Sequence, residues 1–194
     1  MVESVVGGWL LIYGVLTLVF ITGPLAIARS NIALATAALL ALLVLLPGIA
    51  AFVGDSEAIH RYSLLAGIPY FSFLAMLLIR DLLVDKGRVD AEKLWAAVNV
   101  YILIGVCFAF WYAALSAIDP AYFSGKFVEP GLPQQKLMGF VYFSFVTLTT
   151  LGYGDISANT PGVATLTYLE ALIGQLYIAI MIARLVSLYS AKQE

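Results

Sequence analysis

The sequence predicts an all-α integral membrane protein with five transmembrane helices and one shorter helix that enters the membrane without crossing it. Of the 194 residues, 62% are hydrophobic and 11% are charged, and the mean hydropathy is +0.99. Soluble domains average about 45–50% apolar and about 25% charged residues. A water-soluble core of this size cannot bury so much apolar surface, so we expect the chain to lie in a bilayer.

The apolar residues fall into runs that approach or exceed the about 20 residues needed to cross a bilayer as a helix. Residues 1–4 include no lysine or arginine, so we expect the first run to be a retained helix and not a signal peptide. The predicted transmembrane runs are 5–28, 31–53, 62–79, 94–118 and 161–189.

A segment of another kind separates the last two runs. Residues 119–133 begin with Asp-Pro, which ends a helix, and have an irregular pattern. Residues 134–149 then read as a helix that is too short to cross the membrane, and the pattern breaks at Gly152 and Gly154. The chain must return the way it came. A bilayer tolerates such a re-entrant loop only where protein or a water-filled cavity satisfies the backbone.

The charged residues and the cysteine exclude some classes of protein. The net charge is −2 and no dense basic cluster is present, which argues against a nucleic-acid partner. The single cysteine, Cys107, cannot form an intrachain disulfide and lies in an apolar run, so we expect a small buried or lipid-facing side chain there. Membrane lipids are therefore the expected surroundings of the helices.

The motif with the clearest chemical meaning lies in the re-entrant segment. Residues 147–155 read Thr-Leu-Thr-Thr-Leu-Gly-Tyr-Gly-Asp. This resembles the selectivity filter of potassium channels, with Leu151 where valine is commonest. A short helix precedes the motif and a spanning helix follows it, as in that family, and the resemblance covers residues 94–189. It implies a membrane channel that conducts K⁺ passively and selectively.

The resemblance implies that backbone carbonyls form the ion site and that K⁺ is the permeant ion. One filter strand supplies only one side of a cage of oxygen ligands, so the site demands a homotetramer with cyclic symmetry. Gly152 and Gly154 allow backbone angles that would be costly with a Cβ atom. The filter residues, most of which offer a carbonyl to K⁺, are Thr150, Leu151, Gly152, Tyr153 and Gly154.

Other residues are expected to support the filter. Asp155 follows it at the outer mouth, and Tyr142 stands where the family commonly has a tryptophan that bonds this aspartate. Thr147 and Thr149 are expected to support the filter from the end of the preceding helix. Some relatives carry a buried carboxylate at the position of Val146, so the acid pair of those relatives is absent here.

The last helix offers candidates for a hinge and a cavity lining. Gly174 has the spacing from Asp155 that the family's hinge glycine has, but small residues also serve close helix packing in membranes. Both interpretations stay open at this point. Ile178 and Ile182 continue the same face and are expected to line a cavity or an inner constriction. Gln175 is expected to meet Thr149 below the filter.

Glu170 is a carboxylate deep in a predicted spanning helix. Such residues are functional hypotheses by default, because placing them in a membrane is costly. The alternative is a structural tie from the last helix to hydroxyl groups of the short helix, such as those of Ser144 or Thr147.

The chain is predicted to have two parts. Residues 1–90 form a three-helix membrane region of unknown role, which lacks the arginine at every third position that a voltage sensor carries. Residues 91–194 form the pore domain. Within it we expect an outer helix at 94–118, a turret at 119–133, a pore helix at 134–149, the filter at 150–155 and an inner helix at 161–189.

The distribution of lysine and arginine predicts the orientation. With the N-terminus outside and the C-terminus in the cytoplasm, most of these residues are cytoplasmic, as the positive-inside rule requires. The external ones are Arg61, Lys126 and Lys136, and the cytoplasmic ones are Arg29, Arg80, Lys86, Arg88, Lys93, Arg184 and Lys192.

Three other functions compete with a selective channel: a non-selective pore, a potassium transporter subunit, and an enzyme or sensor with a vestigial pore. Non-selective relatives usually lose the second half of the filter, whereas residues 152–154 are intact here. The transporters carry four unlike repeats in one chain, and this chain has one. We find no metal-ligand cluster, nucleophile elbow or phosphate-binding loop in the sequence, so we expect neither an enzyme nor an organic cofactor.

Overall fold

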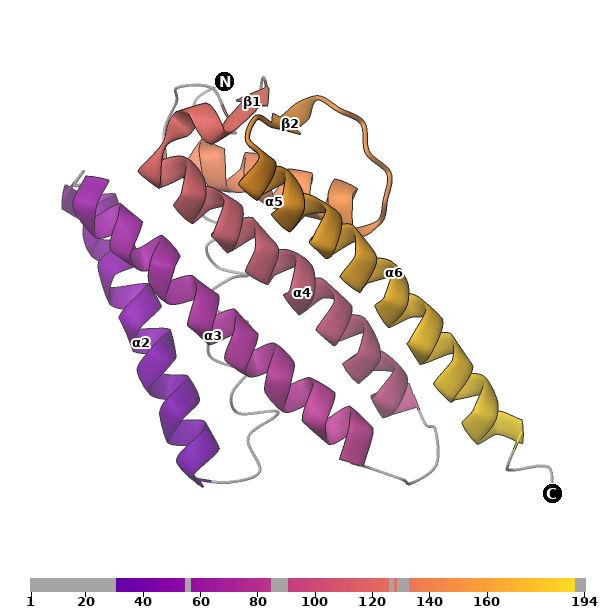
Figure 1. The fold of residues 1–194 in the computed structure, drawn as a ribbon. Coiled ribbons are helices and arrows are strands. Elements are labelled where there is room, and N and C mark those ends of the chain that lie inside the picture. Colours follow the sequence, from indigo (N-terminus) through magenta and orange to yellow (C-terminus); the bar gives the residue numbers. More distant parts are fainter. Residues whose placement is uncertain (1–30, 55–56, 85–90, 126–127, 129–132, 191–194) are drawn as a thin grey trace, which may run out of the picture. The chain divides into compact units, whose positions relative to one another are not determined.

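The computed structural model describes residues 31–54, 57–84, 91–125, 128 and 133–190. These residues form five α-helices, one short 3-10 helix and two short strands (Figure 1). The chain divides into two compact units, Met1–Leu77 and Leu78–Glu194, and each is described by itself. This division falls inside a helix, and the predicted boundary after residue 90 stays a prediction.

The described part of the first unit consists of α2 (Asn31–Gly54) and most of α3 (Glu57–Val84). On α2, Ala37, Ala41 and Val44 are buried at helical spacing and form one stripe. Pro47 and Pro69 lie inside these two helices, which continue through them. Membrane helices tolerate such prolines because neighbouring groups satisfy the freed backbone.

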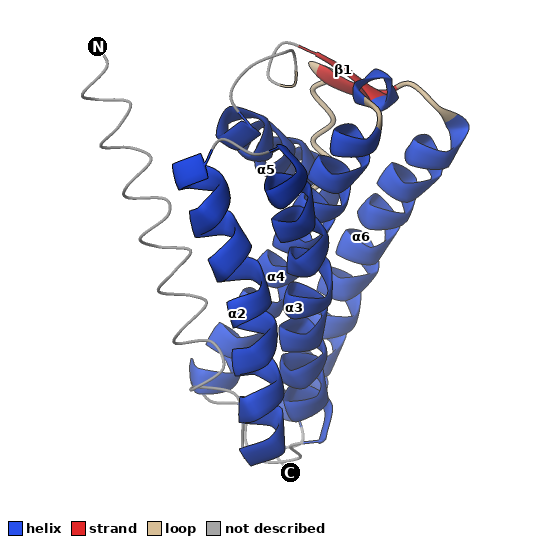
Figure 2. Ribbon diagram, turned by 90° about the vertical axis from the view of Figure 1, so that its left-hand side faces the viewer, coloured by secondary structure: helices blue, strands red, loops and turns tan. Residues whose placement is uncertain are grey.

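The second unit brings three helices together. The long helices are α4 (Ala91–Ile118) and α6 (Pro161–Ser190), and the short α5 (Pro133–Leu148) contacts both of them. Figure 1 shows α5 near one end of α4 and α6, and the view in Figure 2 shows the same arrangement from another side. The observed helices match the predicted outer, pore and inner helices to within a few residues at each end.

A small antiparallel sheet, which the sequence did not predict, lies at this end of the unit. The predicted irregular stretch begins with a 3-10 helix, η1 (Pro120–Tyr122), and continues as strand β1 (Phe123–Gly125). Strand β1 pairs with β2 (Ile156–Ala158), which directly follows the filter motif, and Gly125 lies opposite Ile156. Gly125 has φ +142°, and an added Cβ would lie 2.2 Å from the Asp155 carbonyl oxygen, so only glycine fits.

Aromatic rings join α4, α5 and β1. The Phe123 ring lies 4.8 Å from the Phe140 ring and 5.7 Å from the Tyr112 ring, measured between centroids. Tyr112 also meets Phe143 at 5.1 Å, and all four side chains are buried. Buried aromatic pairs of this kind contribute about 0.5–1.5 kcal/mol each beyond their area. This cluster holds the short helix against the outer helix.

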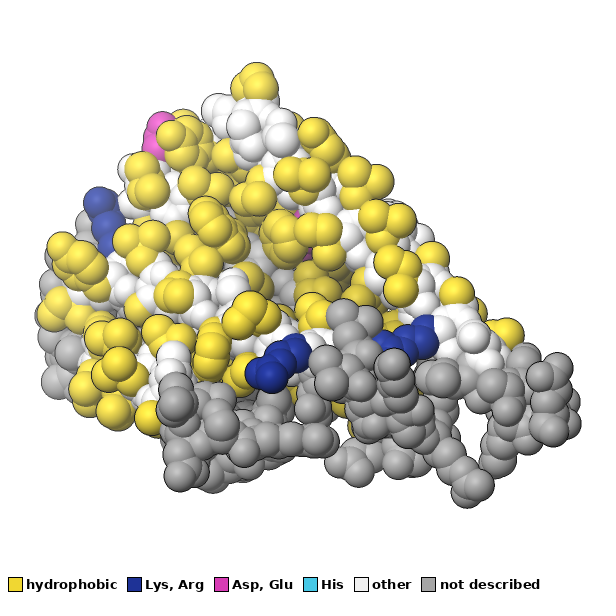
Figure 3. Space-filling view, turned by 60° about the horizontal axis from the view of Figure 1, so that its bottom comes forward, with side chains coloured by type: hydrophobic (Ala, Val, Ile, Leu, Met, Phe, Trp, Pro, Cys, Tyr) yellow, Lys and Arg dark blue, Asp and Glu magenta, His cyan; other side chains and the backbone are white. Residues whose placement is uncertain are grey.

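Three helices in the described residues are long and apolar enough to cross a membrane: Arg61–Arg80, Leu94–Ile118 and Pro161–Arg184. The apolar stretches Ala35–Pro47 and Lys136–Leu148 are shorter. On the face shown in Figure 3, hydrophobic side chains cover most of the described surface. The prediction of an all-α, multi-pass membrane protein is thereby confirmed. The first predicted run, 5–28, lies outside the described residues, so a total of five crossings stays a prediction.

Candidate functional site

The filter segment folds back onto the end of α5 through its own backbone. The last carbonyls of a helix have no partner inside the helix, and here successive N–H groups of residues 149–152 satisfy them. The bonds run from Thr149 N to Phe145 O at 3.1 Å, Thr150 N to Thr147 O at 2.9 Å, Leu151 N to Val146 O at 2.9 Å and Gly152 N to Val146 O at 3.3 Å.

These hydrogen bonds determine where the filter carbonyls point. A trans peptide directs its N–H and its C=O to opposite sides, and no peptide bond in the described residues is cis. The N–H groups of Leu151 and Gly152 point at α5. The carbonyls of the same peptide planes, which belong to Thr150 and Leu151, therefore point away from α5.

The backbone angles extend this arrangement along the filter. Positive φ occurs at every second residue: 59° at Thr150, 60° at Gly152 and 76° at Gly154. A regular strand turns successive carbonyls to opposite sides, and alternating the sign of φ turns them to the same side. A Cβ at Gly152 or Gly154 would meet nothing within 4 Å, so the backbone angle, and not crowding within the chain, requires glycine there.

Among the described residues, Thr150 is the only residue other than glycine with a positive φ. A non-glycine residue in the left-handed region costs about 1–3 kcal/mol. Its hydroxyl accepts a hydrogen bond from Gln175 Nε2 at 3.3 Å. We expected Gln175 to meet Thr149, and this was wrong. Thr149 Oγ1 instead donates to the Phe145 carbonyl at 2.7 Å, a back-bond into the preceding turn of α5.

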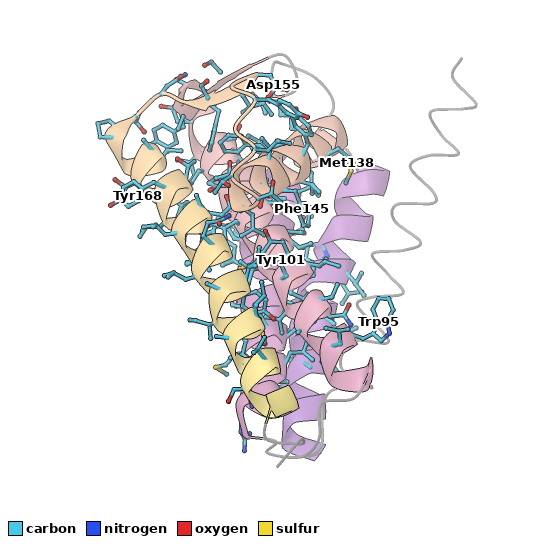
Figure 4. The ribbon with its side chains drawn as sticks, turned by 90° about the vertical axis from the view of Figure 1, so that its right-hand side faces the viewer. Trp95, Tyr101, Met138, Phe145, Asp155 and Tyr168 are labelled. Carbon is cyan, nitrogen blue, oxygen red and sulfur yellow. The ribbon has the colours of Figure 1, made fainter. Side chains whose placement is uncertain are left out.

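The outer end of the segment is held by Asp155. The Tyr142 hydroxyl of α5 donates to Asp155 Oδ2 at 2.7 Å, and Ile156 N donates to Oδ1 at 3.1 Å. The bond to the carboxylate raises the pKa of Tyr142 to about 12, so its hydroxyl stays a donor at neutral pH. Figure 4 shows Asp155 near the end of the unit that carries the strands.

Sequence reasoning missed the residues that anchor the chain just beyond Asp155. Asn159 Nδ2 donates to the Ala121 carbonyl at 3.1 Å, and Asn159 N donates to the Tyr122 carbonyl at 2.9 Å. The Ser124 hydroxyl donates to Asn159 Oδ1 at 2.9 Å. The polar pattern around residues 157–160 was the available signal, but its partners lie more than thirty residues earlier in the chain.

Gly174 lets α6 touch the end of α5. It is buried, and an added Cβ would lie 2.3 Å from the Leu148 carbonyl oxygen and 2.9 Å from Leu148 Cδ1. The Tyr101 hydroxyl of α4 donates to the same carbonyl at 3.2 Å. This contact favours close packing as the reason for glycine at this position. Ile178 and Ile182 lie exposed further along α6.

Glu170 of α6 is fully buried and ties three helices together. The Tyr112 hydroxyl of α4 donates to Glu170 Oε2 at 2.5 Å. Ser144 Oγ of α5 is hydrogen-bonded to Glu170 Oε1, and it also donates to the Gly105 carbonyl of α4 at 2.6 Å. Of the two hydroxyls proposed as partners, the structure brings Ser144 to this carboxyl. The interaction found for Thr147 involves its backbone carbonyl, which accepts a hydrogen bond from Thr150 N.

Replacing Gly174 with alanine separates the packing and hinge interpretations. The added Cβ must push α6 away from the Leu148 carbonyl, so we expect thermal unfolding of the purified protein at a temperature lower by several degrees. The control is Gly162→Ala on the same helix, where nothing lies within 4 Å of the added Cβ, and it should unfold at least as late as the parent. A hinge without packing constraint predicts equal unfolding temperatures for both variants.

Comparison with known proteins adds independent information about this site. Residues 120–191, which run from η1 through α6, match a family model described as "Ion channel". The chain is also 34% identical over 94 residues to the two pore potassium channel c of Oryza sativa subsp. japonica. That match covers 48% of this chain and 18% of the rice protein. No solved structure matches the chain.

The matched segment contains the filter motif, its anchor beyond Asp155 and the helix that carries Gly174 and Glu170. Its geometry presents backbone carbonyls on the side that faces away from α5. In the described residues no group of three or more His, Cys, Asp or Glu side chains is placed to hold a metal ion. Residues 120–191 are therefore similar to an ion-channel family, and they lie in a chain with several helices long and apolar enough to cross a membrane.

Proposed function

We propose that this chain is one subunit of a homotetrameric channel that conducts K⁺ passively and selectively. The observation that carries the proposal is the direction of the filter backbone. The N–H groups of Leu151 and Gly152 are bound to α5, and the carbonyls of the same planes face the open side of the chain. A partly dehydrated cation needs such oxygens from several sides.

The exposure of the filter in a single chain supports assembly around an axis. Leu151 is 56% exposed and Tyr153 is 66% exposed, although both lie between membrane helices in sequence. Unsatisfied backbone carbonyls are not tolerated against lipid. Four copies related by cyclic symmetry would cover the tyrosine side chains and enclose the carbonyls around an axial row of ions.

The filter residues support K⁺ as the permeant ion. The segment 152–154 keeps both glycines with positive φ, so the outer half of the filter retains its carbonyl geometry. The rice protein that shares 34% identity over 94 residues is described as a potassium channel. We infer that Thr150, Leu151, Gly152 and Tyr153 coordinate K⁺ and that no organic cofactor takes part.

The helices around the filter complete the ion pathway. The carbonyl end of α5 carries a partial negative charge, which favours a cation below the filter. Gln175 holds the hydroxyl of Thr150 at the inner end of the filter, and Ile178 and Ile182 of α6 would line the cavity beyond it. Membrane lipids would surround the outer helices.

We further infer that opening depends weakly on voltage. In α3 the arginines Arg61 and Arg80 stand at the two ends of the apolar span, with no basic residue between them. Charges at the ends of a span cross little of the membrane field, and steep gating needs several charges that move through it.

Flux measurements test the proposed conduction. Liposomes that contain the purified protein should take up rubidium without ATP or a coupled ion, and barium should block the uptake. Gly152→Asp should lower rubidium uptake at least about tenfold, because a side chain would stand where the carbonyl ring closes. Gly162→Asp adds the same charge at an open position outside the filter and should retain uptake. Equal permeability to sodium and potassium in the parent protein contradicts the proposal.

Native mass spectrometry in mild detergent tests the assembly. We expect one dominant species at four times the 20.9 kDa mass of the chain. The same preparation should be active in the rubidium assay. Active preparations that contain only monomers or dimers would refute the tetramer.

Cysteine labelling tests the orientation with the N-terminus outside and the C-terminus in the cytoplasm. In a Cys107→Ser background, an impermeant thiol reagent should label Ser157→Cys, beside the filter mouth, on intact cells. It should label Ser187→Cys, near the far end of α6, only after permeabilisation. Both side chains are exposed in the single chain. Ser4→Cys should react like Ser157→Cys, and the opposite pattern at any of the three positions corrects the orientation of that segment.

A further inference from the structure

The buried carboxyl of Glu170 lies where α4, α5 and α6 meet. Its carboxyl partners are Tyr112 of α4 and Ser144 of α5, and all three side chains are fully buried. Ser144 directly precedes the residues whose carbonyls bind the filter N–H groups, Phe145, Val146 and Thr147. A shift of Ser144 must therefore move the acceptors to which the filter backbone is bound.

Counting hydrogens in this cluster favours an uncharged carboxyl. Three oxygen–oxygen contacts need three hydrogens: Tyr112 to Glu170, Ser144 to Glu170, and Ser144 to the Gly105 carbonyl. Tyr112 and Ser144 each supply one hydrogen, and the Gly105 carbonyl supplies none. If the carboxylate were ionised, Ser144 Oγ would face two acceptors with a single hydrogen. A hydrogen on Glu170 Oε1 completes the set, because Ser144 then accepts from Glu170 and donates to Gly105.

We propose that Glu170 is an uncharged carboxylic acid that donates to Ser144, accepts from Tyr112 and thereby positions the end of α5 beneath the selectivity filter. This inference rests on the proposed channel function for its effect on selectivity. The role is that of a positioning residue, since Glu170 reaches the filter only through Ser144 and the carbonyls that follow it.

The surroundings of Glu170 agree with an uncharged group. Its two hydrogen-bond partners carry no positive charge, and a buried ionised carboxylate needs a cation or a full set of donors. The titratable groups that face it in the described residues are Tyr112 and Tyr101, both on α4, and each is a phenol. Ser144 is its partner on α5.

Amide replacement provides the sharpest test. In Glu170→Gln, the side-chain NH₂ can donate to Ser144 and the oxygen can accept from Tyr112, so every contact survives. The ratio of rubidium to sodium uptake should stay within about twofold of the parent. Glu170→Leu keeps the volume but breaks both bonds, and Ser144→Ala breaks the link to α5. Each should lower the ratio about tenfold in preparations that still form the parent oligomer.

The control for these variants is Thr165→Val on the same helix. The Thr165 hydroxyl donates to the Pro161 carbonyl of its own helix, so its loss should leave the uptake ratio unchanged. If Glu170→Gln lowers the ratio of rubidium to sodium uptake as much as Glu170→Leu does, the carboxyl is ionised and the proposal fails. If both Glu170→Leu and Ser144→Ala match the parent, the cluster does not position the filter, and the proposal fails in its second half.

Infrared spectroscopy tests the protonation without any ion flux. The difference spectrum between the parent and Glu170→Gln at neutral pH should contain the carbonyl band of a protonated carboxylic acid, which shifts in heavy water. A difference band of an ionised carboxylate in its place overturns the proposal. If the parent protein conducts no potassium and yet shows the acid band, the proposed function fails while the assignment of an uncharged Glu170 stands.

Discussion

The arrangement of α4, α5 and α6 depends on the backbone hydrogen bonds between residues 149–152 and the end of α5. Four N–H groups of residues 149–152 satisfy carbonyls that a helix end leaves free. The same bonds turn the filter carbonyls away from α5, because a trans peptide directs its two polar groups to opposite sides. One set of bonds therefore ends the short helix, stabilises an otherwise irregular segment and turns its backbone oxygens away from α5.

The end of α5 is held from several directions. Gly174 of α6 lies against the Leu148 carbonyl, and Tyr101 of α4 donates to that same oxygen. Glu170 joins α6 to Ser144, and Tyr142 reaches Asp155 at the opposite end of the filter. Each of these contacts crosses between elements. Displacing either long helix must therefore move the acceptors that shape the filter backbone.

Helix α4 also helps to position α5, although the segment that matches the family model begins after α4, at residue 120. It supplies the Gly105 carbonyl and the Tyr112 hydroxyl to the buried cluster, and Tyr112 also belongs to the aromatic packing around Phe123. Tyr177 of α6 donates to the Ala97 carbonyl of α4 at 2.7 Å, which joins the middle of α6 to the first turns of α4. Without α4, the second unit would lack the donors and the packing surface that position α5.

The sequence by itself determined the membrane class, the positions of the described helices to within five residues at each end, and the filter motif, because apolar run length and glycine spacing are local properties. The tertiary structure decided which side chains meet. Ser144 and not Thr147 reaches Glu170, and Thr150 and not Thr149 meets Gln175, because the rotation of α5 about its axis depends on its packing between α4 and α6. The strand pair just beyond Asp155 was also invisible to sequence reasoning, for a different reason. Its two strands are three residues long and carry no periodic signal, and their pairing joins Phe123 to Ala158 across the whole re-entrant segment.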